Sequence, residues 1–287
     1  MATALEFMFP PFIVCLLLIG ILIYFGIHVI KREIIFIDIA LAQIAALGAT
    51  FSVFFHHLET APAEHSHEEH TFMAYLLSIA FTTLAAGAFT YLKCKKLTIP
   101  LEALIGIAYA VAATGAVILL DTAAGGDVHV KEMMEGHILW VTWGQILELF
   151  IVFSLIGGFH YMFRDKFTAL TDNYNKDIPI DKSTFLWDFL FYATFGIAVV
   201  HAVRVGGILT IFAFLIIPAS ISALFTDNWL RRILIGWGIG TAVTVCGLYL
   251  SWNMDIPSSP TVILFLGVFL LLALAAKSIG LFKTIKN

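Results

Sequence analysis

The stretch "VGGILTIFAFLIIPASISALF" occupies residues 205–225 and contains no charged side chain. A bilayer core about 30 Å thick is crossed by roughly 20 apolar residues in an α-helix. This stretch is therefore long enough and apolar enough to span a membrane. Similar apolar runs recur along the whole chain, so they determine the class of the fold.

The overall composition agrees with this interpretation. Of 287 residues, 60% are hydrophobic and 13% are charged, whereas a soluble domain carries about 25% charged residues. A soluble chain of this size needs a more polar surface. The three cysteines, Cys15, Cys94 and Cys246, are scattered and form neither a disulfide framework nor a paired metal motif. We therefore predict an all-α polytopic membrane protein.

We expect nine membrane spans, with eight as the alternative count. They lie near residues 8–30, 34–55, 72–92, 101–121, 138–163, 184–203, 206–225, 230–252 and 259–280. Lysine and arginine are retained on the cytoplasmic side, and alternate connections hold fourteen of the sixteen basic residues. Only Lys131 and Arg204 lie in the other connections. This asymmetry predicts an outer N-terminus, a cytoplasmic C-terminus and a single transmembrane domain over residues 1–287.

Two connections stand out within that domain, an external one at 56–71 and a cytoplasmic one at 164–183. The external one begins with "HHLETAPAEHSHEEH" (residues 56–70), which holds five histidines and four glutamates. Imidazole and carboxylate bind divalent transition metals, but the irregular spacing offers no closed set of four ligands. We weigh a weak, exchangeable metal-capture site against a polar loop without a function. The candidate ligands are His56, His57, His65, His67 and His70.

Ionisable residues inside a membrane are costly, so each one suggests a function. Four acids fall within the predicted spans. Glu102 follows Pro100 at a helix start and is expected to complement the helix dipole. Asp188 lies near a cytoplasmic end and is expected to reach water. Glu148, in the middle of the fifth span, has no local neutralising partner, so a transport role and a buried hydrogen bond both remain open for it.

The fourth acid, Asp38, belongs to "FIDIALAQIAALGAT" (residues 36–50). At about 100° per residue, Asp38 shares one helical face with Ala42, Ala45 and Ala49. Small side chains allow membrane helices to approach closely. We therefore expect Asp38 to point toward protein and not toward lipid.

These stretches resemble a known family. "FIDIALAQIAALG" is similar to the second-helix motif of ABC-3 type permeases, the membrane subunits of zinc, manganese and iron importers. Residues 100–120 ("PLEALIGIAYAVAATGAVILL") and 247–267 ("GLYLSWNMDIPSSPTVILFLG") resemble two further helices of that family. The stretch at 205–225 resembles its Val-Gly…Ile-Pro-Ala segment, with Pro218 and Ala219 at the characteristic positions. The resemblance covers residues 9 to 275.

The resemblance implies a type II importer-like permease bundle in a bacterial or archaeal inner membrane. Two copies, most simply a homodimer, would line a central path through the lipid bilayer. The cargo would be a divalent metal, zinc first, with manganese or iron as alternatives, and no cofactor would be permanently bound. A separate cytoplasmic ATPase would drive alternating access, and an extracytoplasmic metal-binding protein would deliver the ion. No nucleic-acid partner is expected.

This chain contains no G-x-x-x-x-G-K-[ST] loop, so we expect no enzymatic activity of its own. Its ATPase would bind at residues 164–182 or, as a second candidate, at 226–232. The first of these lacks the small-residue and glycine pattern that the family usually shows there.

The second helix also departs from the family. The family usually has a histidine four residues after the acid, where this chain has Ala42. Asp38 would therefore need another ligand, such as Glu148 or an external histidine.

Two rival functions remain. A self-contained secondary metal carrier usually holds His and Asp one helical turn apart within a span, and the sequence shows no such pair. A haem protein would need paired histidines in facing helices, where only His28 and His160 are candidates.

Overall fold

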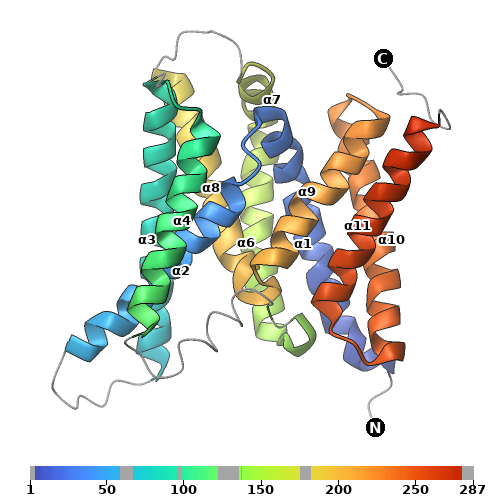
Figure 1. Ribbon diagram of the computed structural model, residues 1–287, viewed down its shortest axis with the longest axis horizontal. Helices are drawn as coiled ribbons and strands as arrows, with labels where there is room; N and C mark the ends of the chain where they lie inside the picture. The colour runs from blue at the N-terminus through green and yellow to red at the C-terminus, as the bar shows by residue number, and fades with distance from the viewer. Residues whose placement is uncertain are drawn as a thin grey trace. The chain divides into compact units, whose positions relative to one another are not determined.

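Long α-helices make up most of the computed structural model, which describes residues 4–58, 67–95, 98–121, 136, 138–174 and 182–279 (Figure 1). The nine long helices among the described residues are α1 (Ala4–Arg32), α2 (Ile37–Leu58), α3 (His67–Cys94), α4 (Leu101–Asp121), α6 (Trp143–Met162), α8 (Lys182–Gly206), α9 (Ile208–Phe225), α10 (Trp229–Met254) and α11 (Ser258–Ser278). Two short helices are η1 (Ile138–Trp140) and α7 (Arg164–Asp172).

Eight of these helices are long and apolar enough to cross a membrane. The ninth, α2, has a shorter apolar stretch within its described side chains, Ile37–Ser52. The predicted all-α fold of about nine spans, with eight as the alternative, is confirmed.

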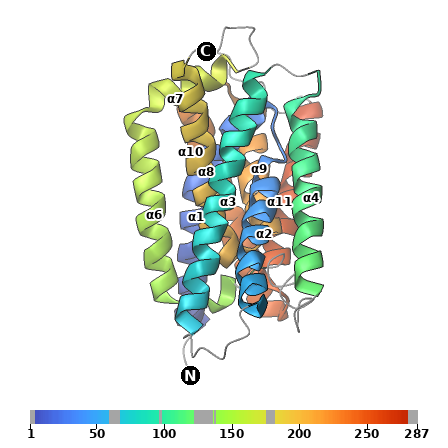
Figure 2. The same cartoon turned by 90° about the vertical axis from the view of Figure 1, so that its left-hand side faces the viewer.

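The chain folds into two compact units that interleave along the sequence (Figures 1 and 2). Unit 1 contains Met1–Glu33, Met134–Phe163 and Ala202–Asn287. Unit 2 contains Ile34–Met133 and Arg164–His201. Neither unit is a continuous piece of sequence, and the predicted single domain over residues 1–287 stays a prediction.

Helix α1 is the centre of unit 1 and packs against α6, α9 and α10. Its approach to α9 is so close that a Cβ atom on Gly26 would lie 1.9 Å from the Leu215 carbonyl oxygen. Further along, Gly236 and Gly240 of α10 pack against Ile23 and Ile19 of α1. Small residues therefore bring the helix backbones together in unit 1, as they commonly do in membrane bundles.

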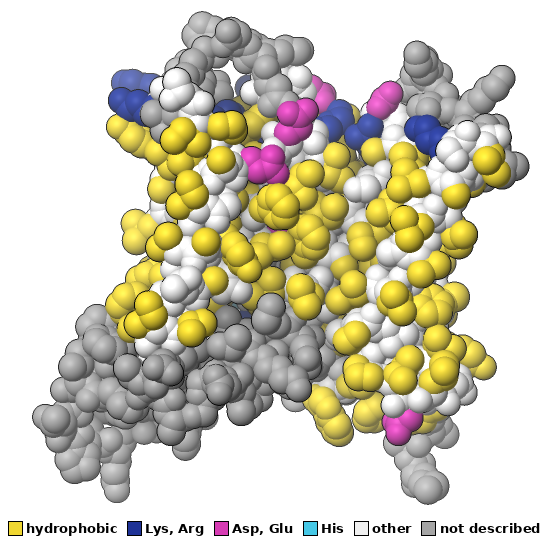
Figure 3. Space-filling view, viewed as in Figure 1, with side chains coloured by type: hydrophobic (Ala, Val, Ile, Leu, Met, Phe, Trp, Pro, Cys, Tyr) yellow, Lys and Arg dark blue, Asp and Glu magenta, His cyan; other side chains and the backbone are white. Residues whose placement is uncertain are grey.

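The two ends of unit 1 differ in charge. Lys31 at the end of α1 lies 4.2 Å from the ring centroid of Trp229, which begins α10. Lys277 at the end of α11 donates a hydrogen bond of 2.8 Å to the Leu224 carbonyl at the end of α9. Both lysines thus lie at the end where α1, α9 and α11 finish, whereas Glu6 and Asp255 occupy the opposite helix ends. Figure 3 shows hydrophobic side chains covering the helix sides, with basic and acidic side chains together along the upper edge and an acidic side chain near the lower edge.

In unit 2, α2 packs against both α3 and α4. A Cβ atom on Gly48 of α2 would lie 2.6 Å from the Leu77 carbonyl oxygen of α3. Two buried hydroxyl groups of α3 form hydrogen bonds within the helix, because Thr82 and Thr90 donate to backbone carbonyls four residues earlier. Such internal hydrogen bonds make hydroxyl groups tolerable in an apolar helix.

Local backbone features end the helices. Gly207 separates α8 from α9 with a φ of 73°, a conformation that glycine adopts at no steric cost. Asp255 ends α10 in the left-handed conformation, which aspartate tolerates better than most residues. At the start of α6, Thr142 and Gln145 form a reciprocal capping box. Residues 208–225 of the stretch quoted at the outset thus form α9, with Pro218 buried inside it, whereas its first two residues end α8.

Candidate functional site

The predicted histidine ligands lie at the edge of what the structure describes. His56 and His57 fall in the last turn of α2, and His67 and His70 in the first turn of α3, but the described part of the chain does not include their side chains. His65 lies outside the described residues altogether. Metal capture by this stretch therefore stays a prediction.

Asp38 lies in the first turn of α2 and is only 2% exposed. Ala42 and Ala45 on the same face are also buried, at 3% and 6% exposure. The expectation that this face points toward protein agrees with this burial. The helix places Asp38 there because its small neighbours allow other helices to approach it closely.

The carboxyl group of Asp38 is incompletely satisfied. Backbone hydrogen bonds from Asp38 and Ile39 reach it, but its Oδ1 atom accepts no hydrogen bond from any described residue. A buried carboxylate oxygen without a partner costs folding free energy, and a bound cation would relieve that cost. No cluster of three or more His, Cys, Asp or Glu side chains that could hold a metal occurs among the described residues, so Asp38 alone does not form a closed site.

Glu148, which has no neutralising partner nearby in the sequence, has one elsewhere in the bundle. Arg204, in the last turn of α8, donates a hydrogen bond of 3.2 Å from Nη1 to Glu148 Oε1. The two side chains remain 42% and 44% exposed. Sequence reasoning missed this ion pair because the partners are far apart in the chain and meet only through tertiary packing. Glu148 is thus accessible, but its carboxylate already forms an ion pair with the guanidinium group of Arg204.

The structure corrects the expectation that Asp188 reaches water. Its side chain is completely buried and forms an ion pair with Lys93 of α3, which is 13% exposed. The Lys93 ammonium also lies 3.7 Å from the ring centroid of Tyr174. The Tyr174 hydroxyl in turn hydrogen-bonds the hydroxyl of buried Tyr192 at 2.7 Å.

We call these four residues of unit 2 the lysine network: Lys93, Asp188, Tyr174 and Tyr192. The carboxylate of Asp188 is neutralised by Lys93 within this network and is not available to an external ion. Because Tyr174 lies two residues after the end of α7, the network also links the end of that short helix to α3 and α8.

His201 is another buried polar residue of unit 2, with 3% exposure. Its Nδ1 atom lies 2.8 Å from the Ile197 carbonyl oxygen, which can only accept, so Nδ1 carries the proton. Its Nε2 atom lies 2.8 Å from the Tyr75 hydroxyl, which donates to it when the ring is neutral. Both ring nitrogens are therefore occupied, and a metal would have to displace Tyr75.

The structure brings together the two histidines of the haem alternative. In unit 1 the Tyr24 hydroxyl lies 3.0 Å from His160 Nδ1. The ring of Tyr24 also contacts the ring of His28, with centroids 4.7 Å apart. Both histidines are buried, and Tyr24 lies against each of them. This arrangement supports a packed aromatic cluster better than an axial ligand pair.

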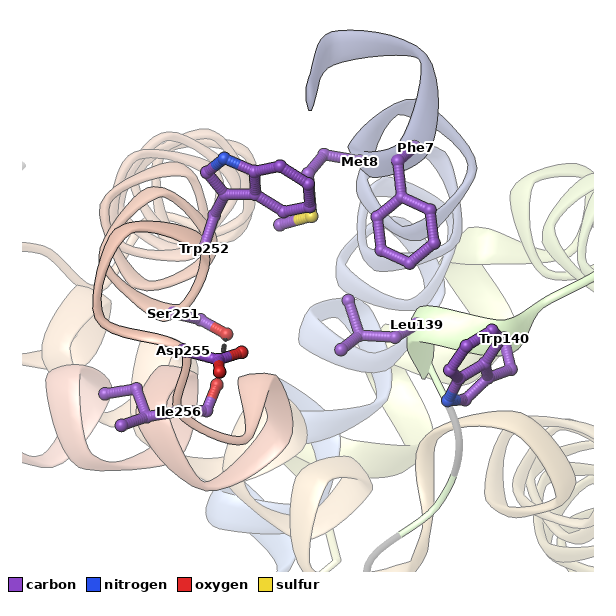
Figure 4. A pocket seen from close by; sticks show the side chains of 8 residues that line it. All are labelled: Phe7, Met8, Leu139, Trp140, Ser251, Trp252, Asp255 and Ile256. Carbon is purple, nitrogen blue, oxygen red and sulfur yellow. Dashed lines mark hydrogen bonds between the residues drawn. The ribbon is translucent and has the colours of Figure 1, made fainter. Parts of the chain in front are cut away.

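One cavity of unit 1 lies at the end that carries Glu6 and Asp255. It has a volume of about 440 Å³ and is drawn in Figure 4. Its lining residues are Phe7, Met8, Leu139, Trp140, Ser251, Trp252, Asp255 and Ile256. The Phe7 ring contacts both Trp140 and Trp252, with centroid distances of 6.1 and 5.7 Å. We call this cavity the aromatic pocket.

Known proteins resemble this chain at low sequence identity. A probable metal transport system membrane protein from Chlamydia pneumoniae is 23% identical over 58% of this chain, and the match spans 57% of that relative's length. The manganese transport system membrane protein MntB from Synechocystis is 24% identical, over 70% of this chain and 68% of its own length.

Among solved structures, PsaBC from Streptococcus pneumoniae in complex with Fab matches with a TM-score of 0.72. That match has 19% identity and covers 93% of this chain and 91% of the other, so it establishes a shared fold. The family match is more extensive, since it runs over residues 4–277. The chain belongs to the ABC 3 transport family.

Proposed function

We propose that this chain is the membrane-spanning permease subunit of an ATP-binding-cassette importer for divalent transition-metal ions. The observation that carries the proposal is the family match over residues 4–277, on a chain with eight helices apolar enough to cross a membrane. The names of two relatives, a probable metal transport system membrane protein and a manganese transport system membrane protein, support the cargo class. The chain is a transport subunit, and a partner ATPase hydrolyses the nucleotide.

Within this proposal the chain lies in a bacterial or archaeal inner membrane with its N-terminus outside and its C-terminus in the cytoplasm. The charge difference between the ends of unit 1 supports this orientation, because basic side chains are retained on the cytoplasmic side. Two copies line the path, and an extracytoplasmic metal-binding protein delivers the ion to the acidic end.

Asp38 is the first candidate for an ion ligand within the path. It is buried, and its Oδ1 atom lacks a partner among the described residues, which is the state expected of a group that receives a cation. Glu148 is the second candidate and would have to exchange Arg204 for the ion. His56, His57, His65, His67 and His70 would collect ions at the outer surface.

The ATPase binds at α7 in this proposal. Phe167 on the inner face of α7 is fully buried and packs against Trp187 and Phe191 of α8. Arg164, Asp165 and Lys166 are exposed, and they supply a polar surface for a cytoplasmic partner. The alternative at 226–232 is held together by Arg232, which donates to the Thr226 carbonyl and to Asp227 at 2.7 Å each.

Zinc and manganese are the leading ions. The family resemblance puts zinc first, whereas carboxylate ligands without imidazole suit manganese. Asp38 is followed one turn later by Ala42 and not by a histidine, which favours manganese. The similarity to a manganese transport system membrane protein favours the same ion. Competition between the two ions for uptake of a radioactive tracer would separate the possibilities.

The proposal is tested by uptake into vesicles that contain the permease with its ATPase. We expect divalent-metal uptake that requires ATP and the binding protein. Uptake driven by a proton gradient without ATP would replace the proposal with the alternative, a self-contained secondary carrier. Absence of metal uptake under both conditions would contradict the metal cargo.

A further inference from the structure

We propose that the aromatic pocket receives a lysine or arginine side chain of the extracytoplasmic metal-binding protein and anchors that protein on the permease. This inference rests on the proposed function, because it names how the delivery partner is recognised. It concerns a part of unit 1 that contains none of the predicted metal ligands.

The first observation is the position of the pocket. Leu139 and Trp140 belong to η1, which precedes α6, and Asp255 and Ile256 belong to the connection between α10 and α11. The pocket is therefore built from helix ends and connections, so it opens beyond the apolar helix sides. A volume of about 440 Å³ lies within the range of about 300–1,000 Å³ found for ligand sites.

The second observation is the aromatic wall. Trp140 and Trp252 are 74% and 45% exposed, and both contact the Phe7 ring between them. Figure 4 shows the three aromatic side chains arranged around an open space, with Asp255 and Ser251 on another side of it. Aromatic faces attract ammonium and guanidinium groups, and exposed tryptophans are common among residues that dominate protein interfaces.

The third observation is the charge. The carboxylate of Asp255 has no hydrogen bond or ion pair with any described residue, although its backbone N–H caps α10 by donating to the Ser251 carbonyl. Its neighbour Ser251 is already occupied, because its hydroxyl donates to the Ile256 carbonyl at 2.6 Å. Asp255 is thus an exposed anionic group of the pocket that no described cation neutralises.

The charge pattern around the pocket selects the partner. Within the described part of unit 1, the charged side chains toward this end are Glu6, Asp255 and the mutually paired Glu148 and Arg204, so the net charge there is negative. Lys31, Arg231, Arg232 and Lys277 lie toward the opposite end, together with the acids Glu33 and Asp227. An acidic end attracts a basic surface, and charge complementarity mainly sets encounter and specificity. A side chain that combines an alkyl stem with a cationic head matches both the aromatic wall and the carboxylate.

The test measures ATP-driven metal uptake as a function of the concentration of the metal-loaded binding protein that supports uptake by the wild type. We expect Asp255→Asn to raise the half-saturating concentration of that protein by about tenfold. We expect Trp252→Ala to raise it by a similar factor, because it removes one aromatic wall. The maximal rate should stay unchanged in both variants, since neither residue lies in the proposed ion path.

The matched control is Glu6→Gln, which removes the same charge from the same end of unit 1 without altering a residue that lines the pocket. An equal shift in this control would mean that general electrostatics, not the pocket, recruits the partner. Unchanged half-saturation in both pocket variants would overturn the inference and leave the proposed function intact. No uptake by the wild type would instead overturn the proposed function.

A lipid headgroup with an ammonium group resembles a lysine side chain chemically, so a second measurement is needed to distinguish lipid binding from binding of the partner protein. Thermal unfolding of wild type and Asp255→Asn is compared in detergent with and without added phosphatidylethanolamine. If the lipid stabilises only the wild type while the half-saturating concentration is the same in both, the pocket binds lipid and the inference is wrong. We expect equal stabilisation of the two proteins.

Discussion

Two buried carboxylates of unit 2 have opposite surroundings. Asp188 is fully buried, and its charge is compensated by Lys93. Asp38 is 2% exposed, and its Oδ1 atom has no partner among the described residues. Equal burial therefore does not imply an equal role. A compensated acid is tolerated in the fold and lowers stability only when its partner is removed, whereas an uncompensated acid lowers stability and remains available to a cation.

The largest expected effect on stability comes from removing the buried acid that forms an ion pair, Asp188. Asp188→Ala leaves the Lys93 ammonium nearly buried without its counter-ion, and we expect the free energy of unfolding to fall by about 3–5 kcal/mol. Unfolding of the purified protein in detergent would measure this loss. The control replaces both charges, as Lys93→Met with Asp188→Leu, and should recover most of the stability. A single variant as stable as the wild type would show that Asp188 is not compensated in this way.

The opposite result is expected at Asp38. Asp38→Asn removes a charge that costs free energy when buried, so thermal stability should be unchanged or higher. Metal uptake should nevertheless fall by about tenfold or more, as expected for a group that holds the ion. Glu102→Gln is the matched control, because Glu102 is also an acid in the first turn of a unit 2 helix. Normal uptake by Asp38→Asn would exclude this residue as an ion ligand.

A smaller effect is expected at the outer part of the lysine network. Tyr174→Phe keeps the ring beside Lys93 but removes the 2.7 Å hydrogen bond between the Tyr174 hydroxyl and the buried Tyr192 hydroxyl. We expect a loss of about 1–3 kcal/mol in the free energy of unfolding, measured in detergent. Replacing both tyrosines with phenylalanine should restore part of it, since both hydroxyls of this hydrogen bond are then removed. Equal stability of the single variant and the wild type would contradict this hydrogen bond.

The smallest expected effect on stability is at the half-exposed pair of Glu148 and Arg204. Because both side chains are more than 40% exposed, Glu148→Gln should lower the free energy of unfolding by only about 0.2–1 kcal/mol. Uptake measurements sharpen the comparison. If Glu148 exchanges Arg204 for the ion, Glu148→Gln raises the half-saturating metal concentration and Arg204→Gln lowers it. Shifts in the same direction for both variants would indicate a purely structural pair.

The sequence predicted the helices well because each span must satisfy its own backbone hydrogen bonds, so its length and apolar character are local properties. Residues 206–225 and α9 (Ile208–Phe225) agree within two residues at the start. Helix α7 was not predicted. Its nine residues are too short and too polar to show a membrane span, and its formation depends on Phe167 packing against α8.

The candidate site was only partly predictable, for a related reason. The burial of Asp38 followed from alanines at helical spacing on its own helix. The partners of Asp188 and Glu148 could not be predicted, because they lie 95 and 56 residues away in the chain. The aromatic pocket combines residues from α1, η1, the end of α10 and the connection before α11, and no local pattern marks such a combination.

By itself, the sequence determined the class of the fold, the number of apolar helices and the charge difference between their ends. Each of these depends on hydrophobicity and charge along a single helix, which the order of residues specifies. Only the tertiary structure decided which acids are compensated and which are not. Compensation depends on side chains from other helices coming within a few ångströms, and that distance is set by how the helices pack.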